Sequence, residues 1–349
     1  MRRVPRSLRE QGRILTMWMG AGELLLMLAV ILIAAEVFTN ALEHLGERMG
    51  ISEGVTGSVF AAIATAMPES MVPLLAFTVD NGDGPRDVHT DVGVGAILGA
   101  PLMLSTLSLC LMGLSVIRRR RWDGPLHPER TGLTRDLNFF LASFAMATVA
   151  LYARGWHAVI AVLLLLLYFI YVLLTLRVSA RLVEAGHGTE ADRGMFLCHL
   201  GLPDHMLTVV AQLGLGLGLL IIGANGFIHG VEQIAAELNV SVLLLSLLIV
   251  PVATELPEKV NSILWIRRRK DTLAFGNITG AMVFQGSILP AIGLLMTPWH
   301  PRHEMLMGLL ITLAAALWLR LLVALAPLRV WHLLVNGALY VVYLVIMLY

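Results

Sequence analysis

Ala64-Thr-Ala-Met-Pro-Glu69 and Ala253-Thr-Glu-Leu-Pro-Glu258 are two copies of one hexapeptide, and each copy lies inside a long apolar stretch. Four of the six positions are identical, and placing residues 34–69 over residues 223–258 gives eight identities. A second pair of blocks, Gly95-Ala-Ile-Leu-Gly-Ala100 and Gly276-Asn-Ile-Thr-Gly-Ala281, follows at a shift of 181 residues instead of 189. An internal repeat of this kind defines the architecture of a fold.

The composition places this repeat in a membrane protein. Of the 349 residues, 57% are hydrophobic and 14% are charged, against about 45–50% and about 25% in soluble domains. A net charge of +1 gives no reason to expect nucleic acid as a partner, and Cys110 and Cys198 form neither a disulfide framework nor a metal pattern. We expect no cleavable signal peptide, because the apolar run after the basic start is too long.

About ten stretches are long and apolar enough to be transmembrane helices. They cover residues 14–42, 53–79, 91–117, 136–153, 156–177, 205–236, 240–265, 272–296, 304–326 and 328–348. The pattern predicts an all-α membrane protein with a first half over 14–177, a cytoplasmic linker over 178–204 and a second half over 205–348. The repeats cover about 34–117 and 223–296, and five crossings per half make the two halves inverted, as in many transporters.

The distribution of basic residues predicts the orientation. Fifteen arginines and lysines lie on one predicted side of the membrane and eight on the other, and the side with fifteen is expected to be cytoplasmic. Both termini would then lie outside, although the basic N-terminal segment opposes this assignment.

The Pro-Glu pairs have a specific chemistry at membrane depth. Proline cannot donate to the carbonyl four residues earlier, so Pro68 and Pro257 release the carbonyls of the preceding turn, where Thr65 and Thr254 lie. A buried carboxylate in the membrane costs at least about 2.5–3.5 kcal/mol unless it meets a partner or water. A lone Pro-Glu pair commonly only kinks a helix, but two related copies favour a shared oxygen cage for Ca²⁺ or Na⁺ around Glu69 and Glu258.

At these residues the sequence resembles the cation/Ca²⁺ exchanger superfamily, which includes the sodium/calcium exchangers. That family carries two inverted repeats, each with a G-T-S-L-P-E-like helix followed by a G-N-x-x-G-S-N-x-F-like helix. The resemblance implies that Glu69 and Glu258 bind the cation, that Thr65 and Thr254 supply carbonyls, and that Ala62 and Pro251 supply further carbonyl contacts to Na⁺. It places Gln285 where the family has Asp or Asn, with Leu104 as the partner in the first repeat. It also implies a prokaryotic cell membrane.

The departures from the family pattern bear on the counter-ion. Ala66, Ala100 and Ala281 replace serines, and Glu255 adds a third carboxylate to Glu69 and Glu258. Fewer neutral ligands and closer carboxylates favour exchange of Ca²⁺ for H⁺, because like charges hold protons. Exchange for Na⁺ stays equally open, and so does a degenerate homologue that binds cations without exchanging them.

Several further residues are candidates for an ion path or for support of the site. Glu36 and Asn225 occupy matched positions in the first helix of each half, as do Glu23 and Gln212, and either pair could line a path or bond a neighbouring helix. Ser70, Asn261 and Ser262 lie within a turn of the glutamates. The glycine blocks predict close helix packing.

Other classes of protein fit less well. The chain has no His-Glu-x-x-His or Gly-x-Ser-x-Gly motif, so we do not expect an intramembrane protease or another enzyme. A channel could use the same carboxylates, but inverted halves with broken helices favour a carrier. We expect a monomer without a cofactor, whose partners are inorganic cations and the lipid bilayer.

Overall fold

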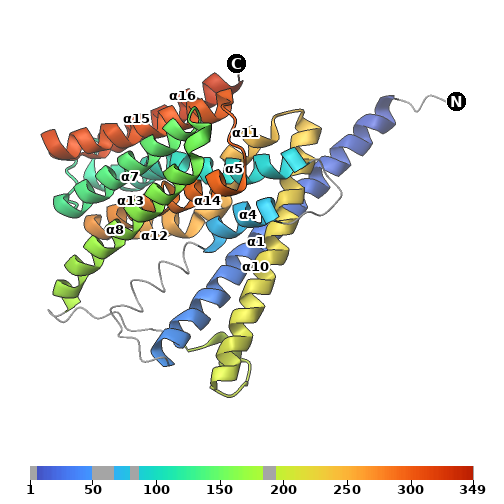
Figure 1. The fold of residues 1–349 in the computed structure, drawn as a ribbon, viewed down its shortest axis with the longest axis horizontal. Coiled ribbons are helices and arrows are strands. Elements are labelled where there is room, and N and C mark those ends of the chain that lie inside the picture. The colour runs from blue at the N-terminus through green and yellow to red at the C-terminus, as the bar shows by residue number, and fades with distance from the viewer. Residues whose placement is uncertain (1–5, 49–66, 79–85, 184–193, 349) are drawn as a thin grey trace. The chain divides into compact units, whose positions relative to one another are not determined.

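The computed structural model describes residues 6–48, 67–78, 86–183 and 194–348 (Figure 1). In these ranges the regular elements are helices, and the one β-type feature is an isolated bridge between Pro125 and Arg329. Seven helices are long and apolar enough to cross a membrane, and they include residues 20–42, 88–120, 154–175, 206–238, 271–296, 303–325 and 330–347. The chain is therefore an all-helical, multi-pass membrane protein, while the count of ten and the two-repeat layout stay predictions.

The helix boundaries follow the expected segments closely where the structure describes them. The helices outside the two motif regions are α1 (Arg6–Arg48), α7 (Arg130–Ala150), α8 (His157–Val183), α10 (Met206–Leu238), α15 (His303–Leu325) and α16 (Val330–Leu348). The segment expected over 53–79 is represented by α4 (Met67–Thr78), because residues 49–66 lie outside the described ranges. Residues 178–204, expected as a linker, contain the end of α8 and the short helix α9 (Phe196–His199).

Two expected helices are interrupted. The segment 240–265 forms α11 (Val242–Thr254) and α12 (Leu256–Arg267), and the segment 272–296 forms α13 (Asp271–Gln285) and α14 (Ile288–Met296). The segment 91–117 is continuous but changes its winding: α5 (Arg86–Met103) passes through a π-helical turn, η2 (Leu104–Ser108), into α6 (Leu109–Arg120). Such π-helical turns are frequent at functional sites, and each of these irregularities falls in or next to a repeat motif.

The helices form two compact units, and each unit contains parts of both predicted halves. One unit comprises residues 1–92 and 174–245, and the other comprises residues 93–173 and 246–349. We refer to them as unit 1 and unit 2. The predicted boundaries of the halves are therefore not the boundaries of the compact units.

Unit 1 is built on the long pair α1 and α10, which lie side by side (Figure 1). Glycines of α10 permit the close approach: a Cβ atom added at Gly216 would lie 2.9 Å from the backbone of Phe38, and one at Gly223 would lie 2.9 Å from Ile31. Gly214 and Gly218, on the same helix, have open space instead. Small residues at such an interface are the usual means of packing helices in a membrane.

A buried polar cluster fixes the register of this pair. Gln212 of α10 donates to the side chain of Asn40 (2.8 Å) and to the carbonyl of Val37 (3.1 Å), both on α1. The two amide oxygens then accept from the backbone of α9, at Leu197 (2.9 Å) and Phe196 (3.1 Å). Of the two roles considered for Gln212, the structure supports the bond to a neighbouring helix.

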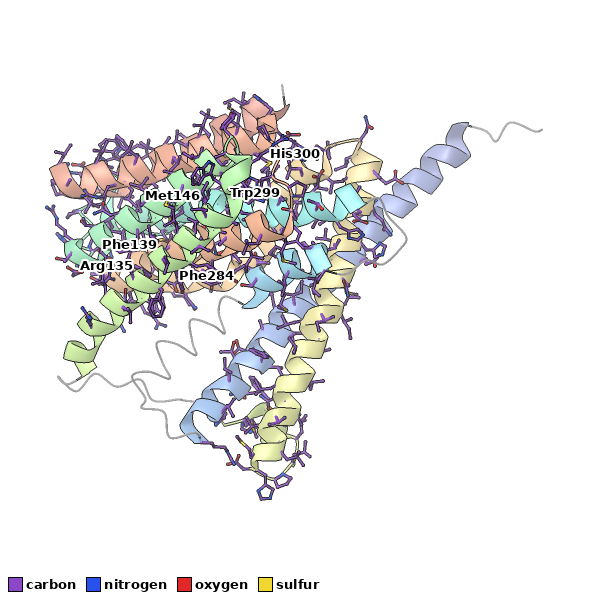
Figure 2. All side chains as sticks on the ribbon, viewed as in Figure 1. Arg135, Phe139, Met146, Phe284, Trp299 and His300 are labelled. Carbon is purple, nitrogen blue, oxygen red and sulfur yellow. The ribbon has the colours of Figure 1, made fainter. Side chains whose placement is uncertain are left out.

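Unit 2 is a bundle in which α6, α7, α12, α13, α15 and α16 pack on one another. Its largest fully buried side chains include Trp299, Tyr343, Phe140 and Phe144. A second aromatic group links α7, α8 and α13, with ring centroids 5.5 Å apart for Phe139 and Tyr171 and 5.7 Å apart for Tyr168 and Phe284. Figure 2 labels Phe139 and Phe284 in this group. The bundle therefore gives the second motif region a densely packed frame.

Candidate cation-binding site

The second Pro-Glu motif breaks its helix, as the sequence predicts. Helix α11 ends at Thr254, α12 begins at Leu256, and Glu255 between them has φ −91° and ψ 9°. Pro257 lies in the first turn of α12, a position that proline favours, and it cannot donate to the carbonyl of Ala253. Glu258 lies in the same turn, where the helix dipole favours a negative charge.

Two carboxylates and one amide from this region are buried together. Glu255 and Gln285 are fully inaccessible and Glu258 is 5% exposed. The amide nitrogen of Gln285 donates to Oε1 of Glu255 over 2.7 Å, so the end of α13 lies against the helix break. The structure therefore brings together three of the predicted cation ligands: Glu255, Glu258 and Gln285.

Each of these three side chains keeps an unused acceptor. Within the described part of the chain, Oε2 of Glu255, Oε2 of Glu258 and Oε1 of Gln285 are buried and have no hydrogen-bond partner. A buried oxygen left in this condition costs about 1–3 kcal/mol, and more if it is charged. Carboxylate and amide oxygens are the ligands that Ca²⁺ and Na⁺ prefer, so each of these three atoms has the chemistry of a cation ligand.

Lys259, which the sequence analysis did not single out, is also part of this group. Its side chain is 6% exposed, and Nζ donates to the carbonyl oxygen of Pro251 (2.9 Å) and to Sδ of Met103 (2.8 Å). The ammonium interacts electrostatically with both Glu255 and Glu258. A third charge inside a buried group of two carboxylates changes the charge balance of the site. The sequence contains a sign of this charge, because a lysine directly follows the motif glutamate.

The neighbouring polar residues hold α12 against α13. Asn277 donates to the backbone carbonyl of Glu258 and to the hydroxyl of Ser262, both over 3.0 Å. Ser262 is fully buried, as expected for a residue that supports the site, whereas the side chain of Asn261 is exposed. The hydroxyl of Thr254 donates to the carbonyl of Val250 (3.2 Å), and its oxygen keeps its lone pairs.

In the first repeat the structure describes only part of the predicted site. Glu69 lies in the first turn of α4 and is 5% exposed, and α4 packs on α10 and α1 within unit 1. Ser70 is partly buried. Ala62 and Thr65 lie outside the described residues. The approach of Glu69 to Glu258, which belongs to unit 2, stays a prediction.

The remaining candidates are placed as follows. Leu104 is fully buried at the start of η2, and its hydrocarbon side chain has no atom that can bind a cation. Pro251 is buried, and its carbonyl accepts from Lys259. Glu36 is exposed on α1 and Asn225 is partly buried on α10, both within unit 1, and their role in an ion path stays a prediction.

The packing role predicted for the glycine blocks is confirmed at Gly99. A Cβ atom at Gly99 would lie 2.3 Å from the carbonyl oxygen of Leu247 and 2.7 Å from the ring of Pro251, so α5 and α11 touch here through their backbones. Among the described residues, a Cβ atom at Gly276 would meet nothing within 4 Å, and one at Gly280 would meet only the hydroxyl of Tyr171 at 3.7 Å. For the block at Gly276 and Gly280, close packing stays a prediction.

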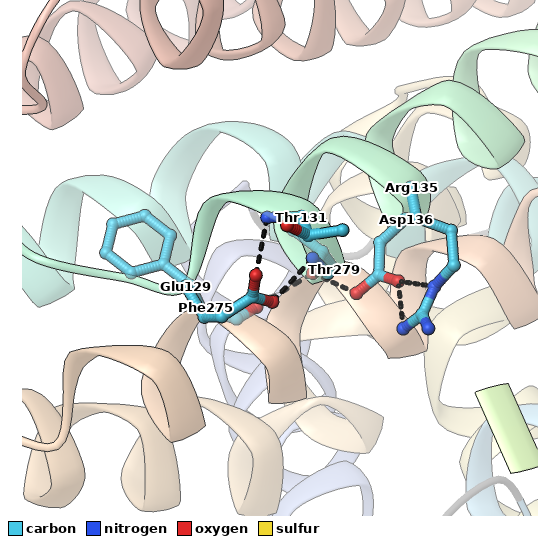
Figure 3. A network of polar contacts seen from close by, with 7 residues as sticks. Glu129, Thr131, Arg135, Asp136, Phe275 and Thr279 are labelled. Carbon is cyan, nitrogen blue, oxygen red and sulfur yellow. Dashed lines mark hydrogen bonds and ion pairs between the residues drawn. The ribbon is translucent and has the colours of Figure 1, made fainter. Parts of the chain in front are cut away.

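A second polar network lies on the other face of α13, and the sequence analysis did not anticipate it (Figure 3). Asp136 of α7 is 4% exposed, and it accepts from the hydroxyl of Thr279 (2.9 Å) and from the guanidinium of Arg135 (3.0 Å). Arg135 also lies over the ring of Tyr171, 5.5 Å from its centroid. These contacts bind α7 and α8 to the helix that carries Gln285.

One end of unit 2 is held by a buried ion pair. Arg120 donates two hydrogen bonds of 2.7 Å to the carboxylate of Asp271, and a third of 2.6 Å to the carbonyl of Ile266. The backbone N–H of His127 donates to the same carboxylate over 2.8 Å. Removing one partner of such a pair costs about 3–5 kcal/mol, so this contact fixes the loops on that side of the bundle.

Comparisons with known proteins identify the family. The sequence profile of the family described as "Sodium/calcium exchanger protein" matches residues 19–177 and 208–349 of the chain. The chain belongs to the sodium/calcium exchanger family. The resemblance carried by the two Pro-Glu motifs is thereby confirmed, and this family consists of transporters.

Relatives in the exchanger family cover most of the chain at low identity. The chain is 24% identical over 278 residues to the putative antiporter CaxA of Alkalimonas amylolytica, covering 78% of this chain and 79% of that protein. It is 26% identical over 277 residues to the inner membrane protein YrbG of Escherichia coli, covering 78% of each. Both are membrane proteins of similar length.

Solved exchanger structures share the fold. The structure of an H⁺/Ca²⁺ exchanger, CAX, superposes with a TM-score of 0.69 at 17% identity, covering 95% of this chain and 82% of that one. The sodium-calcium exchanger NCX_Mj superposes with a TM-score of 0.55 at 20% identity, covering 94% and 99%. At these identities the likeness concerns the fold, and the exchanged ions must be argued from this chain's own residues.

Proposed function

We propose that the protein is an antiporter that moves Ca²⁺, or a related cation, across the membrane in exchange for Na⁺ or H⁺. The observation that carries this proposal is the break between α11 and α12, where Glu255, Glu258 and Gln285 present three buried oxygens without a partner among the described residues. Membership of the exchanger family and the fold shared with CAX and NCX_Mj support it.

In this proposal Glu69 and Glu258 bind the transported cation between the two inverted repeats, with the carbonyls of Thr65 and Thr254 as further ligands. Carboxylates in the membrane face a partner or water, and both of these side chains are almost fully buried. The chain works as a monomer in a prokaryotic cell membrane. Both of its termini lie outside, in line with its distribution of basic residues.

Transport follows an alternating-access cycle in which the first helices of the two halves form a gating pair. The packing of α1 against α10 within one compact unit supports this assignment. The counter-ion binds at a site that overlaps the Ca²⁺ site, so the two fluxes are coupled through competition for the same carboxylates.

The test is uptake of ⁴⁵Ca²⁺ into proteoliposomes that contain the purified protein. A Na⁺ gradient and a pH gradient are imposed separately, and protein-free vesicles serve as the control. We expect one of the two gradients to drive accumulation of Ca²⁺. Uptake with neither gradient above the control would refute the antiporter proposal.

A homologue that binds cations without exchanging them is the second candidate. It is favoured by Leu104 and Ala66, which remove ligand atoms found in the family, and by the ammonium of Lys259 in the buried group. Saturable binding of Ca²⁺ to the purified protein, together with no flux under either gradient, would identify this case. Single-channel currents far above carrier turnover would instead identify a channel.

A further inference from the structure

The position of Lys259 requires an explanation beyond the exchanger motif. Lys259 is one of only two lysines in the chain, and the other, Lys270, is exposed. An ammonium at 6% exposure has lost nearly all of its hydration, which costs several kcal/mol unless anions and carbonyls replace the water. A buried lysine therefore occurs where the surroundings are built to hold a cation.

The surroundings of the Lys259 ammonium are those of a small inorganic cation. The direct acceptors are the carbonyl oxygen of Pro251 and the weakly accepting sulfur of Met103. Neither acceptor carries a charge, and among the described residues no carboxylate oxygen lies within the 4.0 Å of an ion pair, so the ammonium interacts with the buried Glu255 and Glu258 over a longer range. Carbonyl and carboxylate oxygens are also the ligands of Na⁺, so the Pro251 carbonyl and the buried carboxylates nearby could serve a monovalent cation in place of the ammonium.

The charge balance shows what the ammonium does to the site. Glu255 and Glu258 with Lys259 give unit 2 a net charge of −1 in its share of the site. The proposed function adds Glu69 and brings the total to −2. One divalent cation or two monovalent cations neutralise this charge, whereas three carboxylates without the lysine would hold three monovalent cations in exchange for one divalent cation.

From this we propose that the Lys259 ammonium is a built-in cation, which permanently occupies one monovalent cation position of the exchange site and so sets how many ions are exchanged. This proposal rests on the proposed antiport function. It makes exchange electroneutral, with two monovalent ions for each divalent ion. A merely structural lysine would leave the number of exchanged ions unchanged on substitution.

The test compares Lys259→Met with two matched controls, Lys259→Arg and Lys270→Met. Methionine keeps most of the side-chain volume and removes the charge, arginine keeps the charge, and Lys270 lies exposed outside the site. The dependence of ⁴⁵Ca²⁺ uptake on counter-ion concentration and on an imposed membrane potential is measured in proteoliposomes. We expect wild type and Lys270→Met to be insensitive to potential, and the uptake that Lys259→Arg retains to keep the ion count of wild type because the charge is conserved. We expect Lys259→Met to exchange one additional monovalent ion for each Ca²⁺ and therefore to respond to the potential.

A binding measurement separates failure of this proposal from failure of the antiporter proposal. Ca²⁺ binding to the purified, detergent-solubilised protein is titrated for wild type and for Lys259→Ala. Loss of a nearby positive charge should tighten Ca²⁺ binding at least about tenfold. Added methylammonium, which fits the vacated position, should weaken the binding of the variant back toward wild type and leave wild type unaffected.

The outcomes are decisive in each arm. Transport by Lys259→Met with an unchanged ion count and no response to potential overturns the built-in cation. If wild type transports nothing, the antiporter proposal fails, and the binding arm alone decides the role of Lys259. An unchanged Ca²⁺ affinity of Lys259→Ala, together with no effect of methylammonium on that variant, also overturns the built-in cation proposal. If Lys259→Met and Lys259→Ala both aggregate even with methylammonium while Lys259→Arg folds, the lysine is structural and the proposal is rejected.

Discussion

The two repeats can be compared directly by adding one methyl group to each at equivalent positions, Gly99→Ala and Gly280→Ala. At Gly99 the new Cβ atom would lie 2.3 Å from the Leu247 carbonyl oxygen and 2.7 Å from the Pro251 ring. An ordinary contact begins near 3.4 Å, so α5 and α11 must separate by roughly 1 Å. At Gly280 the nearest atom is the Tyr171 hydroxyl at 3.7 Å, and nothing has to move.

These distances predict changes in stability of opposite sign for the two variants. Overpacking of a tight contact costs about 1–3 kcal/mol, and the better helix propensity of alanine returns up to about 1 kcal/mol. We therefore expect Gly99→Ala to lose about 1–2 kcal/mol of stability, and Gly280→Ala to be neutral or stabilised by less than about 1 kcal/mol. Gly99→Ala should also slow Ca²⁺ uptake, because it displaces Pro251, whose carbonyl accepts from Lys259.

The assay is the midpoint temperature at which the detergent-solubilised protein loses its monodisperse peak on gel filtration. Unfolding of such a protein is commonly irreversible, so wild type and both variants are heated at one rate and compared only with one another. Equal midpoints for Gly99→Ala and Gly280→Ala would refute the close approach of α5 to α11 and the reasoning built on it.

Three further predictions concern single side chains. Glu258→Gln should abolish ⁴⁵Ca²⁺ uptake and leave the gel-filtration profile unchanged, and retained uptake would remove this residue from the site. Gln285→Met, which deletes the donor to Glu255 and one ligand oxygen, should weaken Ca²⁺ binding at least about tenfold in the same titration, with an unchanged affinity as the contrary result. Glu129 caps α7: burial is the largest single influence and raises its pKa, but the hydrogen bonds from Gly132 and Thr131 and the charge of Arg135 together outweigh it and hold the pKa below its ordinary value. The cap therefore stabilises the protein above the unfolded pKa of about 4.3 and loses this effect as pH falls through the folded pKa, so Glu129→Ala should cost about 0.5–2 kcal/mol at pH 6 and little at pH 3.

The parts of the fold that the sequence predicts are those encoded by local chemistry. Apolar length predicts the positions of the described helices, although α1 (Arg6–Arg48) extends beyond the predicted 14–42 at both ends. Pro257 predicts the break between α11 and α12 because a missing N–H acts within one turn. The second interruption, at Gly286 and Ser287, was missed. A Cβ atom at Gly286 would lie 2.7 Å from the ring of Phe140. This glycine is therefore required by a contact with α7, a helix distant in sequence, and the periodicity of the local sequence does not show such a contact.

The site was predicted where a motif marked it and missed where only packing defines it. Glu255, Glu258 and Gln285 were named from the motifs, and the structure buries them together. Lys259 is not part of either motif, although any charge at membrane depth indicates a functional site. Asp136 stands at the start of the predicted helix 136–153, and its hydrogen-bond donor, Thr279, lies 143 residues away in the chain.

The glycines of α10 also determine how that helix can deform. Gly214, Gly216 and Gly218 fall within little more than one turn, and the first and last of them meet no neighbouring atom in the described part of the chain. Glycine allows backbone angles to change at low cost, so this section is a point where the helix of 33 residues can bend. Curvature of α10 can therefore change there while its backbone hydrogen bonds persist.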